Sequence, residues 1–202
     1  IVDLFVAKNG VRHINLPTNG LKPRRIYEIA ERGLKNNPKL ELHINIALDG
    51  LRDSHDMMRG VPGNFDRAIE SARILRVLKP IFGTRLEVHI NTVMTRDNLD
   101  EIHPLAEWVF SERLVDGHYF NLIRGNARDP GLKDVTKEKL RRLYPAIADL
   151  QTRYAHRLIQ DRNPLVRWVK RMAYVGTLTF HHRTQFANLD KHSRWSMPCT
   201  AG

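Results

Sequence analysis

Three histidines, each followed by Ile-Asn, are the residues of this chain best suited to chemistry: His13, His43 and His89. Neutral imidazole is a common ligand of divalent metal ions, so these histidines together with Asp49 could form a metal site. Each histidine, however, stands near the start of a segment that predicts a β-strand. Ligands of parallel α/β folds lie at the carboxyl ends of the strands. The pattern therefore favours hydrogen-bonded histidines at the bottom of the fold over a metal site.

A second candidate lies in the segment INIALDGLRDSHDMMRG, residues 44–60, which changes character at Asp49-Gly50. Apolar and polar residues alternate up to Asp49, as they do along a half-buried strand. The residues that follow are polar and charged and predict a loop that ends at Gly60. We expect this loop to cover the mouth of a barrel or of an open sheet.

The remaining elements repeat this order of strand and helix. Strands are predicted at residues 13–20, 42–50, 87–95 and 117–126. The spacing of apolar residues predicts helices over residues 23–35, after a cap at Asn64, after a cap at Asn98, over 136–160 and from 164 to about 179. Four such alternations predict an α/β fold with parallel strands joined by right-handed crossovers.

The carboxyl ends of parallel strands meet at one edge of the sheet. This rule places polar residues that follow the predicted strands along a single rim. They are Thr18-Asn19-Gly20, Asp49-Gly50, Thr95 and Arg124-Gly125-Asn126. We expect the ligand of this protein to bind there.

Composition narrows the class of protein. The 202 residues include 42% hydrophobic and 27% charged residues, and a chain of this length can bury one sizeable core. The sequence has no apolar run long enough for a transmembrane segment and no signal-peptide pattern, so we expect a cytoplasmic protein. The single cysteine excludes an internal disulfide. Residues 131–202 hold 14 Lys or Arg and 5 Asp or Glu of a chain with net charge +11.

The order of the motifs is more specific than any one of them. NLPTNG, IALDGLRDSHDMMRGVPGNFDRAIES, HINTVMTRDNLDEI and FNLIRGNARD follow one another over about residues 1–130. In this order they resemble the middle and later strands of a radical S-adenosylmethionine (SAM) enzyme of the SPASM or twitch subgroup. The resemblance implies a partial (β/α)6-type barrel over residues 1–130. A basic helical extension over residues 131–202 would lead into an auxiliary-cluster region.

The resemblance also implies cofactors. A [4Fe–4S] cluster held by a CxxxCxxC loop binds SAM and cleaves it reductively to a 5′-deoxyadenosyl radical, which abstracts hydrogen from a substrate. No such loop occurs in the 202 residues, so its cysteines are expected outside this chain, which would be an inactive fragment of the enzyme. The expected partners are a reductant such as flavodoxin or ferredoxin and an unidentified substrate, either a peptide or an anionic small molecule.

Individual residues carry the resemblance further. Thr18 and Asn19 match the strand end that approaches SAM, and Asn91 matches an inward position that faces SAM or substrate. Ala47 stands where many relatives have a serine that contacts SAM, so Asp49 or the backbone would have to supply that contact. The backbone of Leu122, Ile123 and Arg124 would meet the adenine. Cys199, in PCTAG, resembles a ligand of an auxiliary [4Fe–4S] cluster. The sequence assigns no catalytic residue.

The basic extension leaves two interpretations open. From Pro164 to Tyr174 the apolar residues Leu165, Trp168, Val169 and Met172 share one helix face, and Arg167, Lys170 and Arg171 lie off it. This pattern favours a helix packed on the barrel with a solvated basic side. Otherwise the helix would dock an acidic peptide, a phosphorylated substrate or anionic lipid. No RNA-binding motif occurs, so we expect no nucleic-acid partner.

Two alternatives to a radical SAM enzyme remain at this point. One is a different α/β-barrel enzyme that uses the histidines and Asp49 around a divalent metal. The other is a non-catalytic barrel whose basic extension holds an anionic partner.

Overall fold

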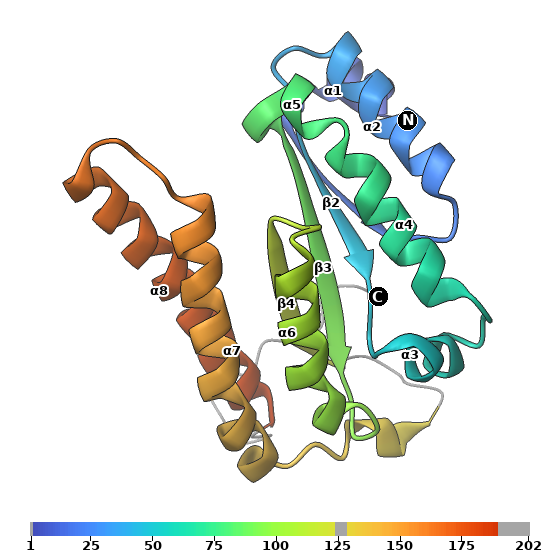
Figure 1. Cartoon of the computed structure of the whole chain (residues 1–202), viewed down its shortest axis with the longest axis vertical. Coiled ribbons are helices and arrows are strands. Elements are labelled where there is room, and N and C mark those ends of the chain that lie inside the picture. The colour runs from blue at the N-terminus through green and yellow to red at the C-terminus, as the bar shows by residue number, and fades with distance from the viewer. Residues whose placement is uncertain (1, 124–128, 190–202) are drawn as a thin grey trace. The chain divides into compact units, whose positions relative to one another are not determined.

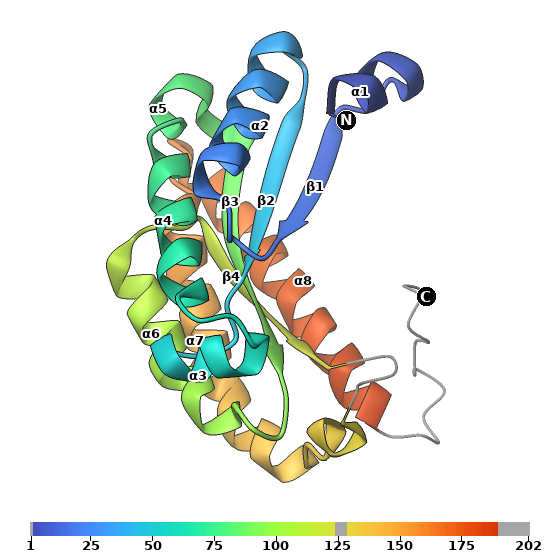
Figure 2. The same cartoon turned by 90° about the vertical axis from the view of Figure 1, so that its right-hand side faces the viewer.

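The computed structural model describes residues 2–123 and 129–189 of the chain (Figure 1). Its four strands form one sheet in the order β1-β2-β3-β4. Their bounds are β1 His13–Thr18, β2 Glu41–Ala47, β3 Leu86–Met94 and β4 Gly117–Leu122. Strands β1, β2 and β3 pair in parallel, and Figure 2 shows β1 beside β2. The predicted α/β class and the predicted strand order along the chain are therefore confirmed.

Helices follow the strands. They are α1 Val2–Asn9, α2 Pro23–Asn36, α3 Arg52–Arg59, α4 Asn64–Arg76, α5 Lys79–Phe82, α6 Ile102–Glu112, α7 Lys137–Leu158 and α8 Pro164–Leu189, with short 3-10 turns at Gly83–Arg85, Leu99–Glu101 and Pro130–Lys133. Of these helices, α2, α4, α6, α7 and α8 were predicted from the sequence. The described helices include none that is both long enough and apolar enough to cross a membrane.

The chain divides into two compact units. The first unit comprises residues 1–92 and 111–119, and the second comprises residues 93–110 and 120–202. The first unit holds β1, β2 and most of β3, with the helices α1 to α5. The second unit holds α6, α7 and α8. The sequence-based division at residue 130 stays a prediction.

The core of the first unit lies on one face of the sheet, under α2 and α4. Leu42, Ile44 and Ile46 of β2 are fully buried, whereas the residues between them are partly exposed. Figure 1 shows α2 and α4 on the same side of β2, and both helices contact that strand. Each buried aliphatic side chain contributes about 1.5–3 kcal/mol. The alternation therefore gives the sheet an apolar covered face and a polar open face.

Gly20 fixes the turn between β1 and α2. Its φ of +73° lies in the left-handed region. A Cβ at this position would stand 2.6 Å from Cα of Ala68 on α4. The Gly20 carbonyl accepts a hydrogen bond of 2.8 Å from Oγ of the buried Ser71. Only glycine allows this close approach of the turn to the α4 backbone.

The second unit has its own core, which α6 and α7 supply together with the ends of β3 and β4. Members include Met94, Ile102, Phe120, Leu140 and Tyr154, all buried. Arg157 of α7 lies over the ring of Phe110 at 3.6 Å and donates to the Phe110 carbonyl at 2.9 Å. These contacts hold α6 against α7.

Helix α8 is longer than predicted, and its apolar face is not buried. The predicted face of Leu165, Trp168, Val169 and Met172 is 50% or more exposed throughout. The buried residues of α8 are instead Leu178, His182 and Gln185. The Gln185 side chain donates a hydrogen bond to the carbonyl of Phe120 at 2.7 Å. The expectation that this apolar face is packed is therefore wrong.

The basic side of α8 is also not simply solvated. Arg171 donates to the carbonyl of Ile159 at 2.9 Å, and Lys170 pairs with Asp161 at 2.8 Å. Arg167 donates to the Asp161 carbonyl at 3.1 Å. These cations close the turn between α7 and α8, which is their role within this unit.

We predict that Gly20→Ala destabilises the chain by several kcal/mol, because the new Cβ overlaps the α4 backbone. Gly60→Ala is the matched control, since Gly60 has a φ of +63° and no atom lies within 4 Å of the position that its Cβ would occupy. It should cost only about 1 kcal/mol of backbone strain. Urea unfolding of both variants measures the difference. Equal losses would show that strain, and not the contact with Ala68, determines the effect.

Candidate functional site

The open face of the sheet in the first unit is a ladder of polar side chains. Successive rows run across the strands because the register pairs Asn15 with His43 and His43 with Glu87. The next row pairs Asn45 with His89, and the row nearest the carboxyl ends pairs Ala47 with Asn91. Asn45 also donates to the side chain of Asn15. A face of this composition can bind a polar ligand but would not pack against an apolar layer.

The predicted Thr18-Asn19-Gly20 motif forms a turn that is closed by hydrogen bonds from its own side chains to its backbone. Thr18 Oγ1 accepts from the Gly20 N–H at 3.2 Å, and Asn19 Oδ1 accepts from the Leu21 N–H at 3.2 Å. A cavity of about 250 Å³ beside this turn is lined by Thr18, Asn19, Lys22 and Arg25 together with apolar residues of β1 and α2. The two side chains therefore shape the end of β1, and their proposed contact with SAM stays a prediction.

Asp49 is nearly buried, and its interactions are with the segment that follows it. Its carboxylate pairs with Arg59 at 2.5 Å, and its backbone N–H donates to Nδ1 of the buried His55 at 3.0 Å. Burial lowers the pKa of His55 and so favours the neutral ring that accepts this bond. In this arrangement Asp49 positions α3, and its proposed contact with SAM stays a prediction.

The polar segment after β2 is a helix and not the predicted loop. Residues Arg52–Arg59 form α3, which ends at Gly60 in the left-handed conformation. The buried residue of α3 is the polar His55. The helix therefore lacks the stripe of buried apolar residues from which most helices are recognised in a sequence. Helix α3 is held by polar contacts with the end of the strand instead of by an apolar stripe.

Asp56 caps the following helix α4. Its carboxylate accepts from the N–H groups of Phe65 at 2.8 Å and Gly63 at 2.5 Å. The bond from Phe65 is the largest cause of a lowered pKa for Asp56. The predicted cap, Asn64, is instead the first helical residue and makes no capping bond. The sequence prediction was wrong because the cap comes from a residue eight positions earlier in the chain.

Asn91 is the predicted site residue that lies on the open face. It is partly exposed and stands beside Ala47 in the register. Its carbonyl accepts from the Leu48 N–H at 3.1 Å, which joins the ends of β2 and β3. Because Ala47 has no polar side chain, Asn91 supplies the polar side chain of this pair.

A buried polar link lies behind this row. Thr92 Oγ1 donates to the Leu48 carbonyl at 2.5 Å and contacts Nε2 of His118 at 2.7 Å. His118 is fully buried, and burial lowers its pKa to about 3. This histidine is therefore neutral at physiological pH.

The remaining predicted rim residues belong to the second unit or lie outside the described residues. Asn98 occupies the predicted cap position, but its side chain accepts from the Thr95 N–H at 2.8 Å and donates to the Val93 carbonyl at 2.8 Å. Leu122 ends β4, and the Ile123 N–H donates to the Met94 carbonyl at 3.1 Å. Arg124 and Cys199 fall outside the described residues.

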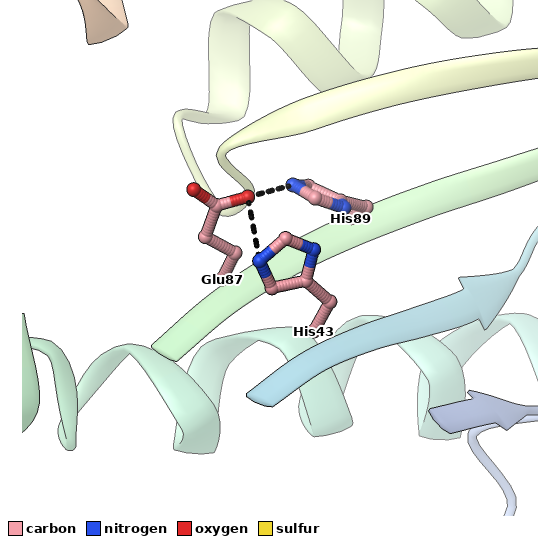
Figure 3. A group of neighbouring side chains, drawn as sticks. All are labelled: His43, Glu87 and His89. Atoms are coloured by element: carbon pink, nitrogen blue, oxygen red, sulfur yellow. Dashed lines mark ion pairs between the residues drawn. The ribbon is translucent and has the colours of Figure 1, made fainter. Parts of the chain in front are cut away.

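Two of the histidines, His43 within β2 and His89 within β3, flank a carboxylate that the sequence analysis did not select. Glu87 Oε2 lies 3.4 Å from Nε2 of His43 and 3.1 Å from Nε2 of His89 (Figure 3). The bond from His89 is the largest cause of a lowered pKa for Glu87, and burial lowers the pKa of His43. The partner expected from the sequence was Asp49, which instead pairs with Arg59. The spacing Glu87-x-His89, which puts both side chains on one strand face, was the available signal.

Comparison with known proteins adds one finding. The chain is 29% identical over 120 residues to an AdoMet-dependent heme synthase of Methanosarcina barkeri. The similarity supports the radical SAM superfamily. The match covers 56% of this chain and 31% of the relative, so the chain spans under a third of the length of that protein. No protein-family model matches the chain.

The residues present fit the two implied cofactors unequally. A cluster of the radical SAM type needs three thiolates, and the 202 residues contain one cysteine, so they do not supply its ligands. The open face does offer side-chain amides and a polar surface next to the strand ends, which suit the polar groups of SAM. The residues present therefore suit SAM better than they suit the cluster.

We predict that acid destabilises the fold through His118. The folded-state pKa of about 3 lies below the unfolded value of about 6.5, so the unfolded chain binds more protons between these two pH values. The contribution of His118 to the free energy of unfolding is therefore complete above pH ~6.5. It falls by about 1.4 kcal/mol per pH unit as the pH drops toward 3.

Urea unfolding between pH 7.5 and pH 4.5 measures this slope. His118→Gln keeps a side-chain N–H for Thr92 but cannot titrate, so the variant should be less stable at pH 7 and show a shallower slope. A slope unchanged from the wild type would mean that other groups carry the pH dependence.

Proposed function

We propose that this chain is the part of a radical SAM enzyme that binds and orients SAM along the open face of its sheet. The similarity to an AdoMet-dependent heme synthase carries this proposal. The parallel sheet, with Asn91 near the carboxyl ends of β2 and β3, supports it because ligands of such sheets bind at that edge.

In this proposal Asn91 is the side chain of the first unit that contacts SAM. It shares its row with Ala47, where many radical SAM enzymes have a serine. The turn at Thr18 and Asn19 shapes the carboxyl end of β1, and Asp49 holds α3 at the end of β2. Leu122, Ile123 and Arg124 would provide backbone contacts to the adenine.

For the whole protein we propose reductive cleavage of SAM at a [4Fe–4S] cluster and hydrogen abstraction from a substrate, with flavodoxin or ferredoxin as the reductant. The cluster supplies the electron, and its ligands lie outside these residues. The substrate is proposed to be a peptide or an anionic small molecule. Cys199 is proposed as a ligand of an auxiliary cluster of the SPASM type, and the enzyme as cytoplasmic.

The coding sequence upstream of Ile1 gives the first test. We expect it to encode a CxxxCxxC loop followed by a strand that ends in Gly-Gly-Glu-Pro. A stretch of upstream coding sequence without cysteines would overturn the radical SAM proposal and leave a barrel that binds some other ligand.

SAM binding to the full-length protein with its cluster reconstituted tests the role of Asn91. We predict that Asn91→Ala weakens SAM binding by about tenfold or more, since a hydrogen bond to a charged ligand contributes about 1.5–3 kcal/mol. Isothermal titration calorimetry measures the affinity, and release of 5′-deoxyadenosine measures the cleavage.

Asn36→Ala is the matched control, because Asn36 is a surface residue of α2 that bonds to Asp3. It should leave SAM affinity unchanged. Ala47→Ser, which restores the hydroxyl of the related enzymes, should tighten binding. An Asn91→Ala protein that binds SAM like the wild type would remove Asn91 from the site.

A further inference from the structure

Three metal-ligating side chains converge on the open face of the first unit, in the two rows next to the predicted SAM row on the amino-terminal side. His43 stands on β2, and Glu87 and His89 stand on β3 (Figure 3). The register pairs His43 with Glu87, and His89 follows Glu87 on the same strand face. One ligand atom of each residue lies within 4.8 Å of the other two. The backbone of a rigid parallel sheet therefore holds the group together.

The spacing of these atoms matches a metal site. In tetrahedral zinc sites the ligand atoms lie about 2.0–2.2 Å from the metal, which places them about 3.3 Å from one another. Glu87 Oε2 lies 3.4 Å from the ring nitrogen of His43 and 3.1 Å from that of His89. Two of the three separations thus already have the required length, and a small rotation of the rings closes the third.

The surroundings leave room for both rings and for one more ligand. The His89 side chain is 5% exposed, and the Tyr119 ring packs edge-on against it at 5.0 Å. A Cβ on Gly117 would stand 3.3 Å from the His89 ring, so glycine keeps this space open. The Glu87 side chain is 39% exposed, which gives water or a substrate access to a fourth coordination position.

Neighbouring charges do not oppose a cation here. Lys79 is the nearby cation among the groups that influence Glu87, and its ammonium pairs with Asp116 at 2.9 Å. His13 packs edge-on against His43 at 4.3 Å, but its own Nδ1 faces Glu41 at 3.7 Å. His13 therefore supports the His43 ring and is not one of the three converging ligands.

We propose that His43, Glu87 and His89 bind a divalent transition metal ion of the zinc type, with a fourth position open to solvent. Two imidazoles and one carboxylate form a donor set that such ions prefer, and zinc sites with one open position use it. The site does not depend on the proposed SAM function, because it uses other residues and lies in other rows of the sheet.

Zinc titration of the tag-free 202-residue chain tests the proposal. A Cys199→Ser background removes the one thiolate. We expect one zinc ion per chain at micromolar or tighter affinity, and a melting temperature that rises with zinc. Cobalt(II) in place of zinc should give the intense visible absorption of a tetrahedral site with nitrogen and oxygen ligands.

Glu87→Gln separates a metal ligand from a structural hydrogen-bond acceptor. Glutamine still bonds to both histidines but lacks the negative charge, so the variant should fold and melt like the metal-free wild type. Its zinc affinity should fall at least about tenfold. His43→Gln should show the same loss, and loss of the cobalt spectrum should accompany it.

His103→Gln is the control, since His103 and Glu107 form an exposed histidine–carboxylate pair on α6 at 3.7 Å. This variant should bind zinc like the wild type. Zinc binding that survives in Glu87→Gln and His43→Gln, or that is lost equally in His103→Gln, would overturn the proposed site. Absence of binding to the wild type would show that Glu87 only bonds the two histidines.

Discussion

The two faces of a parallel strand follow different rules in this chain, and the arrangement of both candidate sites depends on that difference. Leu42, Ile44 and Ile46 are buried under α2 and α4, which fixes the side of β2 that faces the helices. Every second residue must then point to the other face, whatever its chemistry. A slip of one residue would bury histidine and asparagine under the helices and is therefore strongly disfavoured. The apolar core thus sets the positions of polar residues that it never touches.

Beyond the end of β2, polar contacts and not apolar packing determine where the next helices lie. Helix α3 follows β2 without an apolar stripe of its own, and its place is set by Asp49, through Arg59 and His55. Asp56 then caps α4 from within α3, so two consecutive helices are positioned by carboxylates in one short segment. In such a segment, replacing one carboxylate by a neutral side chain displaces a whole helix. Buried ion pairs and helix caps tolerate the loss of one partner poorly.

Much of the fold was predictable because its signals are local. Alternating residues gave the four strands to within a few positions, and Pro23 and Thr136 marked the beginnings of α2 and α7. The errors occur where distant residues decide. Helix α3 lacks periodicity, the α4 cap comes from Asp56, and α8 buries a different face from the one its apolar residues suggest. Glu87 joined His43 only once the register between β2 and β3 was known, and no pattern within one strand contains that register.

Thr92 has a consequence for the chemistry of its buried neighbour. Its hydroxyl gives its one hydrogen to the Leu48 carbonyl, so toward His118 it can act only as an acceptor. The proton of the neutral His118 ring must therefore reside on Nε2. A single uncharged hydroxyl thereby selects one of two imidazole tautomers inside an apolar core, a choice that many proteins make with a carboxylate. Valine at position 92 would have the same shape as threonine but no hydroxyl. It would neither select a tautomer of His118 nor link β3 to the end of β2 and to β4 by polar contacts.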